Sequence, residues 1–200
     1  MTGHRVLCAG VATCLFVAWA AGAFAQTPAQ AAPPPAQAAP PPAQAAPPPA
    51  SPADVASLDA IMTAVYDVIS GSAGQLRNWD RMRSLFVPGA RLIPAVPKKE
   101  GGAEARVLSV EDYIARSGPR MEKDGFFERE IARKVERFGN IAHVFSTYES
   151  RRTQNDAKPF ARGINSFQLL KDGDRWWIVT IYWDSERPDN PIPPEYLPRR

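Results

Sequence analysis

The chain has 200 residues, of which 44% are hydrophobic and 22% are charged, and its formal net charge is +3. This small and mixed charge excludes the basic surface of a nucleic-acid-binding protein. Residues 26–200 contain no cysteine and a single histidine, His143, which excludes cysteine-based and histidine-rich metal sites there. We therefore expect neither a metal nor a cofactor.

Residues 1–25 have the pattern of a cleaved secretory signal peptide. Residues 6–25 are uncharged, follow the basic Arg5 and end in Ala23-Phe24-Ala25, a small-x-small cleavage site. We expect an exported protein, periplasmic or secreted, whose mature form begins at Gln26. The alternative is an uncleaved anchor, since about 20 apolar residues could span a bilayer; only then would the protein contact a membrane.

Residues 26–52 form a low-complexity spacer, in which the segment Ala-Gln-Ala-Ala-Pro-Pro-Pro occurs three times between residues 29 and 49. The spacer has no charged or aromatic residue, and its prolines favour an extended polyproline II conformation. We expect a semi-rigid tether outside the folded domain. The domain then spans residues 53–200, with a proline-rich tail from about residue 187.

The first segments of this domain have sequence patterns that predict helices. Ser51-Pro52 is typical of a helix start, and apolar residues then recur at helical spacing as far as Gly71. A second, shorter helix is predicted from Asn78, its N-cap, to a stop at Pro88-Gly89. A short strand is predicted over residues 90–94.

A third helix is predicted after an exposed loop and a short extended segment at residues 106–108. Ser109 and Asp112 have the spacing of a capping box, and the helix is expected to end at Ser117.

The rest of the domain is predicted to be sheet. Asp172-Gly173 and Gly139-Asn140 both lie between runs rich in β-branched and aromatic residues, a strong signal for tight β-hairpin turns. The strands expected to flank these turns are residues 126–138, 141–152, 161–170 and 175–184. Helices followed by antiparallel strands indicate an α+β fold.

Three segments carry a resemblance to a known family: residues 78–93, residues 140–148 and the Gly-Asp-Arg-Trp-Trp-Ile-Val strand at 173–179. Over residues 53–186 the chain resembles exported bacterial members, of unknown function, of the nuclear transport factor 2-like (SnoaL-like) superfamily. The resemblance implies a curved, mostly antiparallel sheet wrapped round N-terminal helices, a cone-shaped, cystatin-like roll with a ligand cavity. It also implies a homodimer formed through the outer face of the sheet.

The superfamily includes enzymes and proteins without any reaction, so the resemblance leaves enzyme status open. Three functions are consistent with it. The chain could be an exported accessory protein that binds a small apolar ligand, an acid/base isomerase, cyclase or dehydratase, or a non-catalytic dimeric interaction module.

Strand alternation predicts which residues line the cavity. A two-residue Asp172-Gly173 turn would place Asn165 opposite Thr180 on a face that mixes apolar and polar groups, as binding sites do. The ligand-binding residues predicted from this face and the neighbouring hairpin are Asn165, Phe167, Trp176, Ile178, Thr180 and Tyr148. Acid/base catalysis needs a carboxylate with a raised pKa beside a phenol, and Asp184 and Tyr182 are the candidates.

In the first hairpin, the same logic places Ile131 opposite Tyr148 and, on the reverse face, Glu136 opposite His143. We expect the latter to be a surface pair worth at most ~1 kcal/mol. The alternating charges of residues 127–137 are interpreted as a solvated sheet face. A one-residue bulge would change the facing of this strand.

Overall fold

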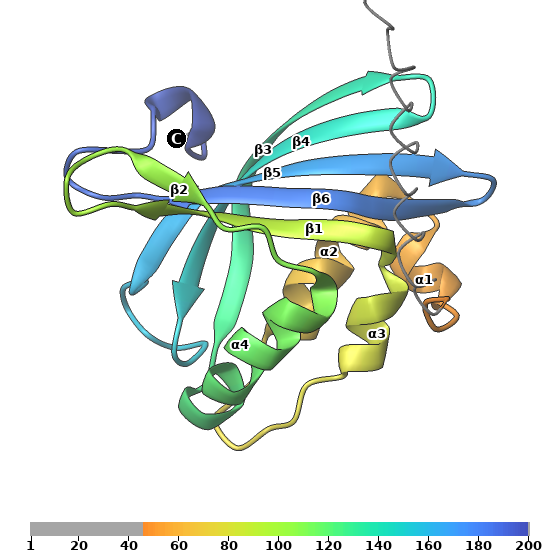
Figure 1. Ribbon diagram of the computed structural model, residues 1–200, viewed down its shortest axis with the longest axis horizontal. Coiled ribbons are helices and arrows are strands. Elements are labelled where there is room, and N and C mark those ends of the chain that lie inside the picture. Colours follow the sequence, from red (N-terminus) through yellow and green to blue (C-terminus); the bar gives the residue numbers. More distant parts are fainter. Residues whose placement is uncertain (1–45, 200) are drawn as a thin grey trace, which may run out of the picture. The chain divides into compact units, whose positions relative to one another are not determined.

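The computed structural model describes residues 46–199, so the predicted signal peptide and most of the predicted spacer lie outside the described residues. Among the described residues, no helix is long and apolar enough to cross a membrane. The elements in chain order (Figure 1) are α1 (Pro52–Val55), α2 (Leu58–Ile69), α3 (Trp79–Ser84), β1 (Phe86–Pro97), β2 (Ala103–Ala105), α4 (Val110–Asp124), β3 (Phe127–Phe138), β4 (Ile141–Arg151), β5 (Ala161–Asp172), β6 (Arg175–Ser185) and the 3-10 helix η1 (Pro194–Tyr196).

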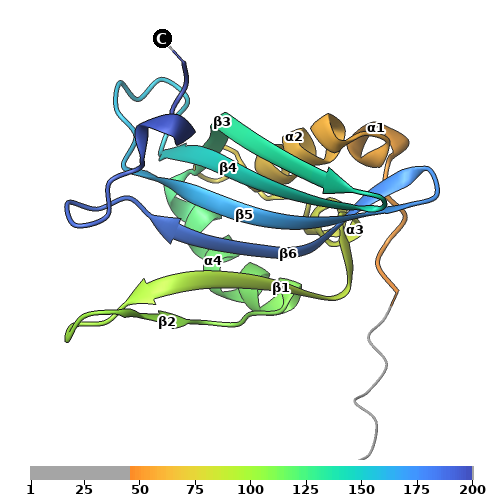
Figure 2. The ribbon, with the colours of Figure 1, turned by 90° about the horizontal axis from the view of Figure 1, so that it is seen from above.

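The strands form one six-stranded sheet in the order β2-β1-β6-β5-β4-β3. β1 runs parallel to β6, and every other neighbouring pair is antiparallel. The sheet is curved, the helices α2, α3 and α4 lie on one side of it, and η1 lies on the other (Figures 1 and 2). The predicted fold class, α+β with a curved and mostly antiparallel sheet, is confirmed.

The first predicted helix is divided into α1 and α2. Ser57 begins α2 anew, because its side chain accepts a hydrogen bond from the backbone N–H of Ala60 at 3.0 Å, as an N-cap residue does. The apolar stripe that predicted one helix is then buried mainly by α2, where Ile61 and Met62 are almost fully inaccessible.

β1 begins earlier than the predicted strand at 90–94. Its pairing with β6 is irregular between Phe86 and Arg91, and Gly89 there has φ of 81°, so the strand passes through Pro88 without a regular ladder at that point. β2 pairs with β1 at residues 103–105, and the extended segment predicted at 106–108 continues this pairing, because Leu108 forms an antiparallel bridge with Leu92.

Helix α4 continues beyond its predicted end at Ser117, in spite of Pro119. Tertiary packing explains the extension: a Cβ atom on Gly118 would lie 2.9 Å from the ring of Trp79, so the helix approaches α3 closely there. Met121 on the next turn is buried in the core.

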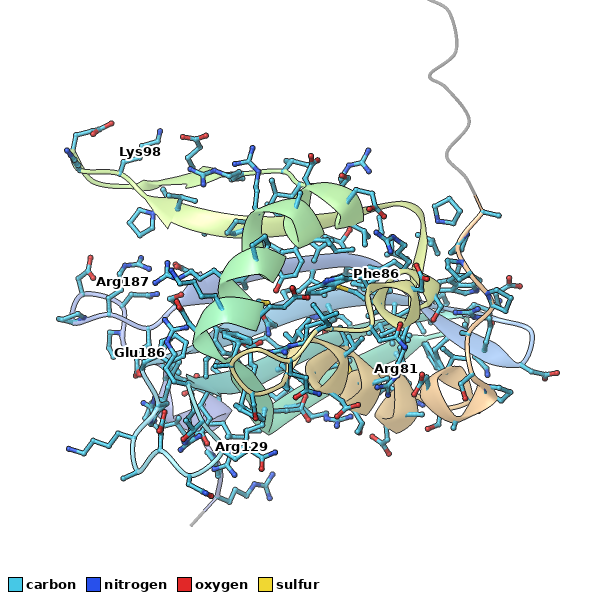
Figure 3. The ribbon with its side chains drawn as sticks, turned by 90° about the horizontal axis from the view of Figure 1, so that it is seen from below. Arg81, Phe86, Lys98, Arg129, Glu186 and Arg187 are labelled. Carbon is cyan, nitrogen blue, oxygen red and sulfur yellow. The ribbon has the colours of Figure 1, made fainter. Side chains whose placement is uncertain are left out.

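Two arginines fasten the helical layer together. Arg81 of α3, which is labelled in Figure 3, forms ion pairs with Asp54 of α1 at 2.8 Å and with Asp67 of α2 at 2.5 Å. The buried Arg77 donates hydrogen bonds to carbonyl groups at the end of α2 and near the end of α4, those of Ile69, Gly71 and Met121. The positions of α2 and α4 over the sheet are thereby linked.

The C-terminal tail lies against the outer face of the sheet. The ring of Tyr196 packs against Phe145 of β4 with centroids 5.0 Å apart, and the Thr147 hydroxyl donates to the Tyr196 carbonyl at 2.6 Å. Near the start of the tail, Arg187 donates to the Asp184 carboxylate at 2.6 Å. The expected tail is therefore part of the packed domain.

Candidate functional site

A cavity of about 260 Å³ lies between the inner face of the sheet and helices α2 and α4. Most of its wall is apolar, with Val65 and Ile69 from α2, Met121 from α4, and Phe167 and Ile181 from the sheet. The polar side chains that border it are Tyr66, Tyr113, Ser117, Glu128, Tyr148, Ser150 and Asn165. An apolar cavity with a few convergent polar groups is the usual form of a small-molecule site.

A bulge in β3 places Glu128 in this cavity. From the Gly139-Asn140 turn as far as Ala132, each residue of β3 is opposite the expected residue of β4. Glu130, and not Ile131, is then opposite Tyr148, so Ile131 is the extra residue of the bulge. Beyond the bulge the alternation is inverted, and Glu128 is opposite Ser150 on the inner face. The expected solvated face for this part of β3 is therefore wrong, because one extra residue turns the following side chains to the opposite side.

The surroundings of Glu128 favour its neutral form. Its carboxylate accepts a hydrogen bond from Ser150 Oγ at 2.8 Å, and the partly buried side chain borders the cavity. Burial raises its pKa to about 7, and the hydrogen bonding of Ser150 and of the neighbouring Asn165 opposes the rise only in part. A carboxyl group of this kind can take up or release a proton near neutral pH.

Tyr66 is fully engaged in a chain of hydrogen bonds. Asn165 Nδ2 donates to the Tyr66 hydroxyl at 3.1 Å, and that hydroxyl lies 2.7 Å from Ser146 Oγ. Ser146 Oγ in turn donates to the Glu130 carboxylate, so Tyr66 must be the donor to Ser146. The chain ends at the ion pair of Glu130 with Arg133. It orients the Asn165 side chain but leaves no free proton on Tyr66.

Tyr113 of α4 is the phenol available to a ligand. Within residues 46–199 its hydroxyl has no hydrogen-bond partner, and its ring is held edge-on against Trp183 with centroids 6.3 Å apart. Burial raises the pKa of Tyr113, and the nearby Glu128 charge adds to the rise. The phenol therefore stays protonated and can donate a hydrogen bond into the cavity.

Tyr148 is the second phenol in the wall. Burial raises its pKa to about 12, and the hydrogen bond with Ser185 opposes the rise. The two hydroxyl oxygens of this pair are 3.3 Å apart. Its hydroxyl lies directly over Gly163, where an added Cβ would be 2.6 Å away. The absence of a side chain at Gly163 thus makes room for Tyr148.

Only some of the site residues predicted from the sequence lie at the cavity. Asn165, Phe167 and Tyr148 line the cavity. Trp176 and Ile178 are buried in the adjoining core without bordering the cavity, and Thr180 pairs with Gln168 instead of Asn165.

Tyr182 and Asp184 lie on the outer face of the sheet, beside the C-terminal tail. A bulge in β6 is the reason: the register shifts between Leu169 paired with Ile178 and Gln168 paired with Thr180. The expected facing of Tyr182 and Asp184 is therefore wrong, because the alternation is inverted after the bulge. Ile181 and Trp183 take their place in the cavity wall.

The pairing of Glu136 with His143 is confirmed on the outer face, where the Glu136 carboxylate lies 3.7 Å from His143 Nδ1. His143 Nε2 is 3.0 Å from Ser166 Oγ, so the ring belongs to a surface network away from the cavity. Among residues 46–199 no group of three or more histidine, cysteine, aspartate or glutamate side chains could hold a metal ion.

Sequence reasoning did not identify Glu128 or Tyr113. Glu128 belongs to a run of alternating charges in the sequence. Only the bulge at Ile131 turns its side chain to the inner face of the sheet, away from the exposed charged residues. Tyr113 was within reach of the sequence, because it follows the capping box and shares a helix face with Ser117 and Met121, which also border the cavity.

No family model matches the chain, and no curated protein matches it. Solved structures do. An NTF2-like protein of unknown function from Methylobacillus flagellatus is 19% identical with a TM-score of 0.43, covering 66% of this chain and 95% of that one. A putative Ca/calmodulin-dependent kinase II association domain from Exiguobacterium sibiricum is 16% identical with a TM-score of 0.48, covering 66% and 92%.

A putative ketosteroid isomerase from Parabacteroides distasonis is 14% identical with a TM-score of 0.42, covering 65% of this chain and 88% of that one. At these identities and TM-scores the likenesses say nothing about function. By its own strand order and helix placement, the domain is an α+β fold with a curved, mostly antiparallel six-stranded sheet.

Proposed function

We propose that the cavity binds a small, largely apolar carbonyl compound and that Glu128 transfers a proton on it by general acid/base catalysis. The observation that supports this function is the partly buried carboxyl group of Glu128, which borders a mostly apolar cavity together with the phenol of Tyr113. A cavity of about 260 Å³ is slightly smaller than the ~300 Å³ at which sites for drug-sized ligands begin. The ligand is correspondingly small.

The proposed chemistry follows from the two side chains. The Glu128 carboxylate removes a proton from a carbon next to the carbonyl, and the Tyr113 hydroxyl donates a hydrogen bond to the oxygen as it becomes negative. The Glu128 carboxylic acid then returns the proton to a different carbon, which completes a double-bond shift. A pKa of about 7 for Glu128 suits both steps, since the same group must act as base and as acid near neutral pH.

Two further parts of the proposal come from the sequence. The signal pattern of residues 1–25 supports action outside the cytoplasm. A homodimer through the outer sheet face stays a prediction, and any such contact would have to include or displace the tail that packs on Phe145.

The experiment uses cyclohex-3-enone as the probe, because its double-bond shift produces a conjugated ketone that absorbs in the ultraviolet. Proton NMR in D₂O follows deuterium uptake next to the carbonyl in the same sample. We expect the protein to accelerate both, and we expect Glu128→Gln to lose about 100-fold or more of the rate, the usual contribution of a general base.

The control is Glu136→Gln, which makes the same substitution on the outer face, where the side chain is 85% exposed. It should retain the full rate. If the probe binds but neither deuterium uptake nor isomerisation exceeds that of the buffer, the proposed proton transfer is refuted and the cavity belongs to a non-catalytic carrier.

A further inference from the structure

Two phenylalanines border one end of the cavity, and an arginine lies against the ring of one of them. Phe126, which precedes β3, and Phe160, which precedes β5, both border the cavity, and their ring centroids are 6.1 Å apart. Phe160 is 50% exposed, so this end of the cavity is open to solvent. The guanidinium carbon of Arg152 lies 4.3 Å from the centroid of the Phe160 ring.

The position of Arg152 follows from strand alternation. Tyr148 and Ser150 face the cavity from β4, and Arg152 follows at the next alternate position, just beyond the end of the strand. Alternate residues of a strand are ~7 Å apart, so the backbone of Arg152 is about that far from Ser150, which donates to Glu128. The backbone of Arg152 therefore lies one strand repeat beyond that of the residue that donates to the carboxyl group of the site.

No carboxylate of the described residues neutralises this cation. Among residues 46–199, the Arg152 guanidinium forms no salt bridge; it stacks on Phe160 and makes one long contact, 3.4 Å, with the Gly125 carbonyl. The nearby Asp156 carboxylate is occupied by the backbone N–H groups of Arg152 and Thr153. The adjacent Arg151 contrasts with it, because Arg151 is paired with the Glu149 carboxylate.

We propose that Arg152 is a specificity-determining residue, which selects ligands whose apolar body fills the cavity and whose carboxylate or other anionic group remains at its open end. The inference rests on the proposed ligand-binding function of the same cavity. An arginine stacked on an aromatic ring presents its N–H donors at the ring edge, a suitable arrangement for a carboxylate. The apolar wall would exclude the anion from the interior because a buried, unpaired charge is costly.

The test compares two ligands of nearly equal shape, 4-phenylbutanoate and 4-phenylbutanamide, by isothermal titration calorimetry at low salt. We expect the wild-type protein to bind the carboxylate more tightly than the amide. Arg152→Gln should weaken carboxylate binding about tenfold or more, as the loss of a charge-assisted hydrogen bond does, and should change amide binding less than twofold. Arg152→Lys should lose less than Arg152→Gln, and the control Lys158→Gln, in the same loop, should leave both affinities unchanged.

Three outcomes would overturn the proposal. If Arg152→Gln weakened the binding of both ligands equally, Arg152 would shape the opening of the cavity without distinguishing a charged ligand from a neutral one. Equal wild-type affinities, with the amide bound in the cavity, would refute the preference for anions and leave the proposed cavity function intact. Failure of both ligands to bind would refute the proposal for Arg152, whereas the proposed function is tested separately with cyclohex-3-enone.

Discussion

Replacing Glu128 with glutamine should make the protein more stable, and the gain should grow with pH. The pKa of Glu128 is about 7 in the folded protein, against an ordinary value of 4.5. Between these values the folded state holds the proton and the unfolded state releases it, so the stability of the wild-type protein falls as the pH rises from about 4.5 to 7. Glutamine does not titrate, so the stability of the variant does not include this decrease with pH.

The size of the effect follows from the two pKa values. A pKa difference of one corresponds to 1.36 kcal/mol, so the gap between 4.5 and about 7 gives about 3 kcal/mol as an upper value. Part of this loss has already occurred at pH 5. The difference in unfolding free energy between Glu128→Gln and wild type should therefore increase by about 2 to 3 kcal/mol between pH 5 and pH 8.

Urea unfolding followed by tryptophan fluorescence, on both proteins at both pH values, measures this difference. Other titrating groups contribute equally to the two proteins and cancel. A difference that stays constant with pH would mean that Glu128 titrates at its ordinary pKa, and the account of a desolvated carboxyl in the cavity would be wrong.

Four other predictions test separate parts of the structure. Gly163→Ala should cost about 2 kcal/mol or more in urea unfolding, because the new Cβ would lie 2.3 Å from the Asp184 carbonyl oxygen; unchanged stability would contradict this packing. Arg77→Met should cost about 3 kcal/mol or more, since it removes the Arg77 donors from the carbonyl groups of Ile69 and Met121, and a smaller loss in the same assay would mean that water replaces them. Tyr182→Phe and Asp184→Asn should leave isomerisation of the ketone probe unchanged, whereas a loss of rate would return the site to the outer face. Intact mass of the exported protein should show Gln26 as the first residue, and a retained leader would indicate an anchor.

Local signals predicted the fold well where they act over a few residues. The Gly139-Asn140 turn and its pairing up to Ala132 agree with the sequence, as does the capping box of Ser109 with Asp112. Both hairpins have nearly the expected strands, but the second turn is Gly173-Asp174 and not Asp172-Gly173, because Asp172 pairs with Arg175. In each case neighbouring residues determine the geometry, through turn conformation, capping and alternation.

The site was harder to predict because it depends on two bulges. One at Ile131 brings Glu128 into the cavity, and one between Ile178 and Thr180 removes Tyr182 and Asp184 from it. A bulge relieves the strain of a strongly curved sheet and is set by tertiary packing, so alternation read from sequence cannot locate it. Helix α4 shows the same limit, because packing on Trp79 carries it past Pro119.

The central claim is that Glu128 is a cavity carboxyl that exchanges protons near neutral pH in contact with the ligand. Carbon-13 NMR of protein labelled at the glutamate carboxyl carbon tests it directly, with Glu128→Gln used to assign the signal. We expect one signal, absent from the variant, to titrate near pH 7 and to shift when 4-phenylbutanamide is added. A Glu128 signal that titrates near 4.5 and does not respond to the ligand would contradict the account.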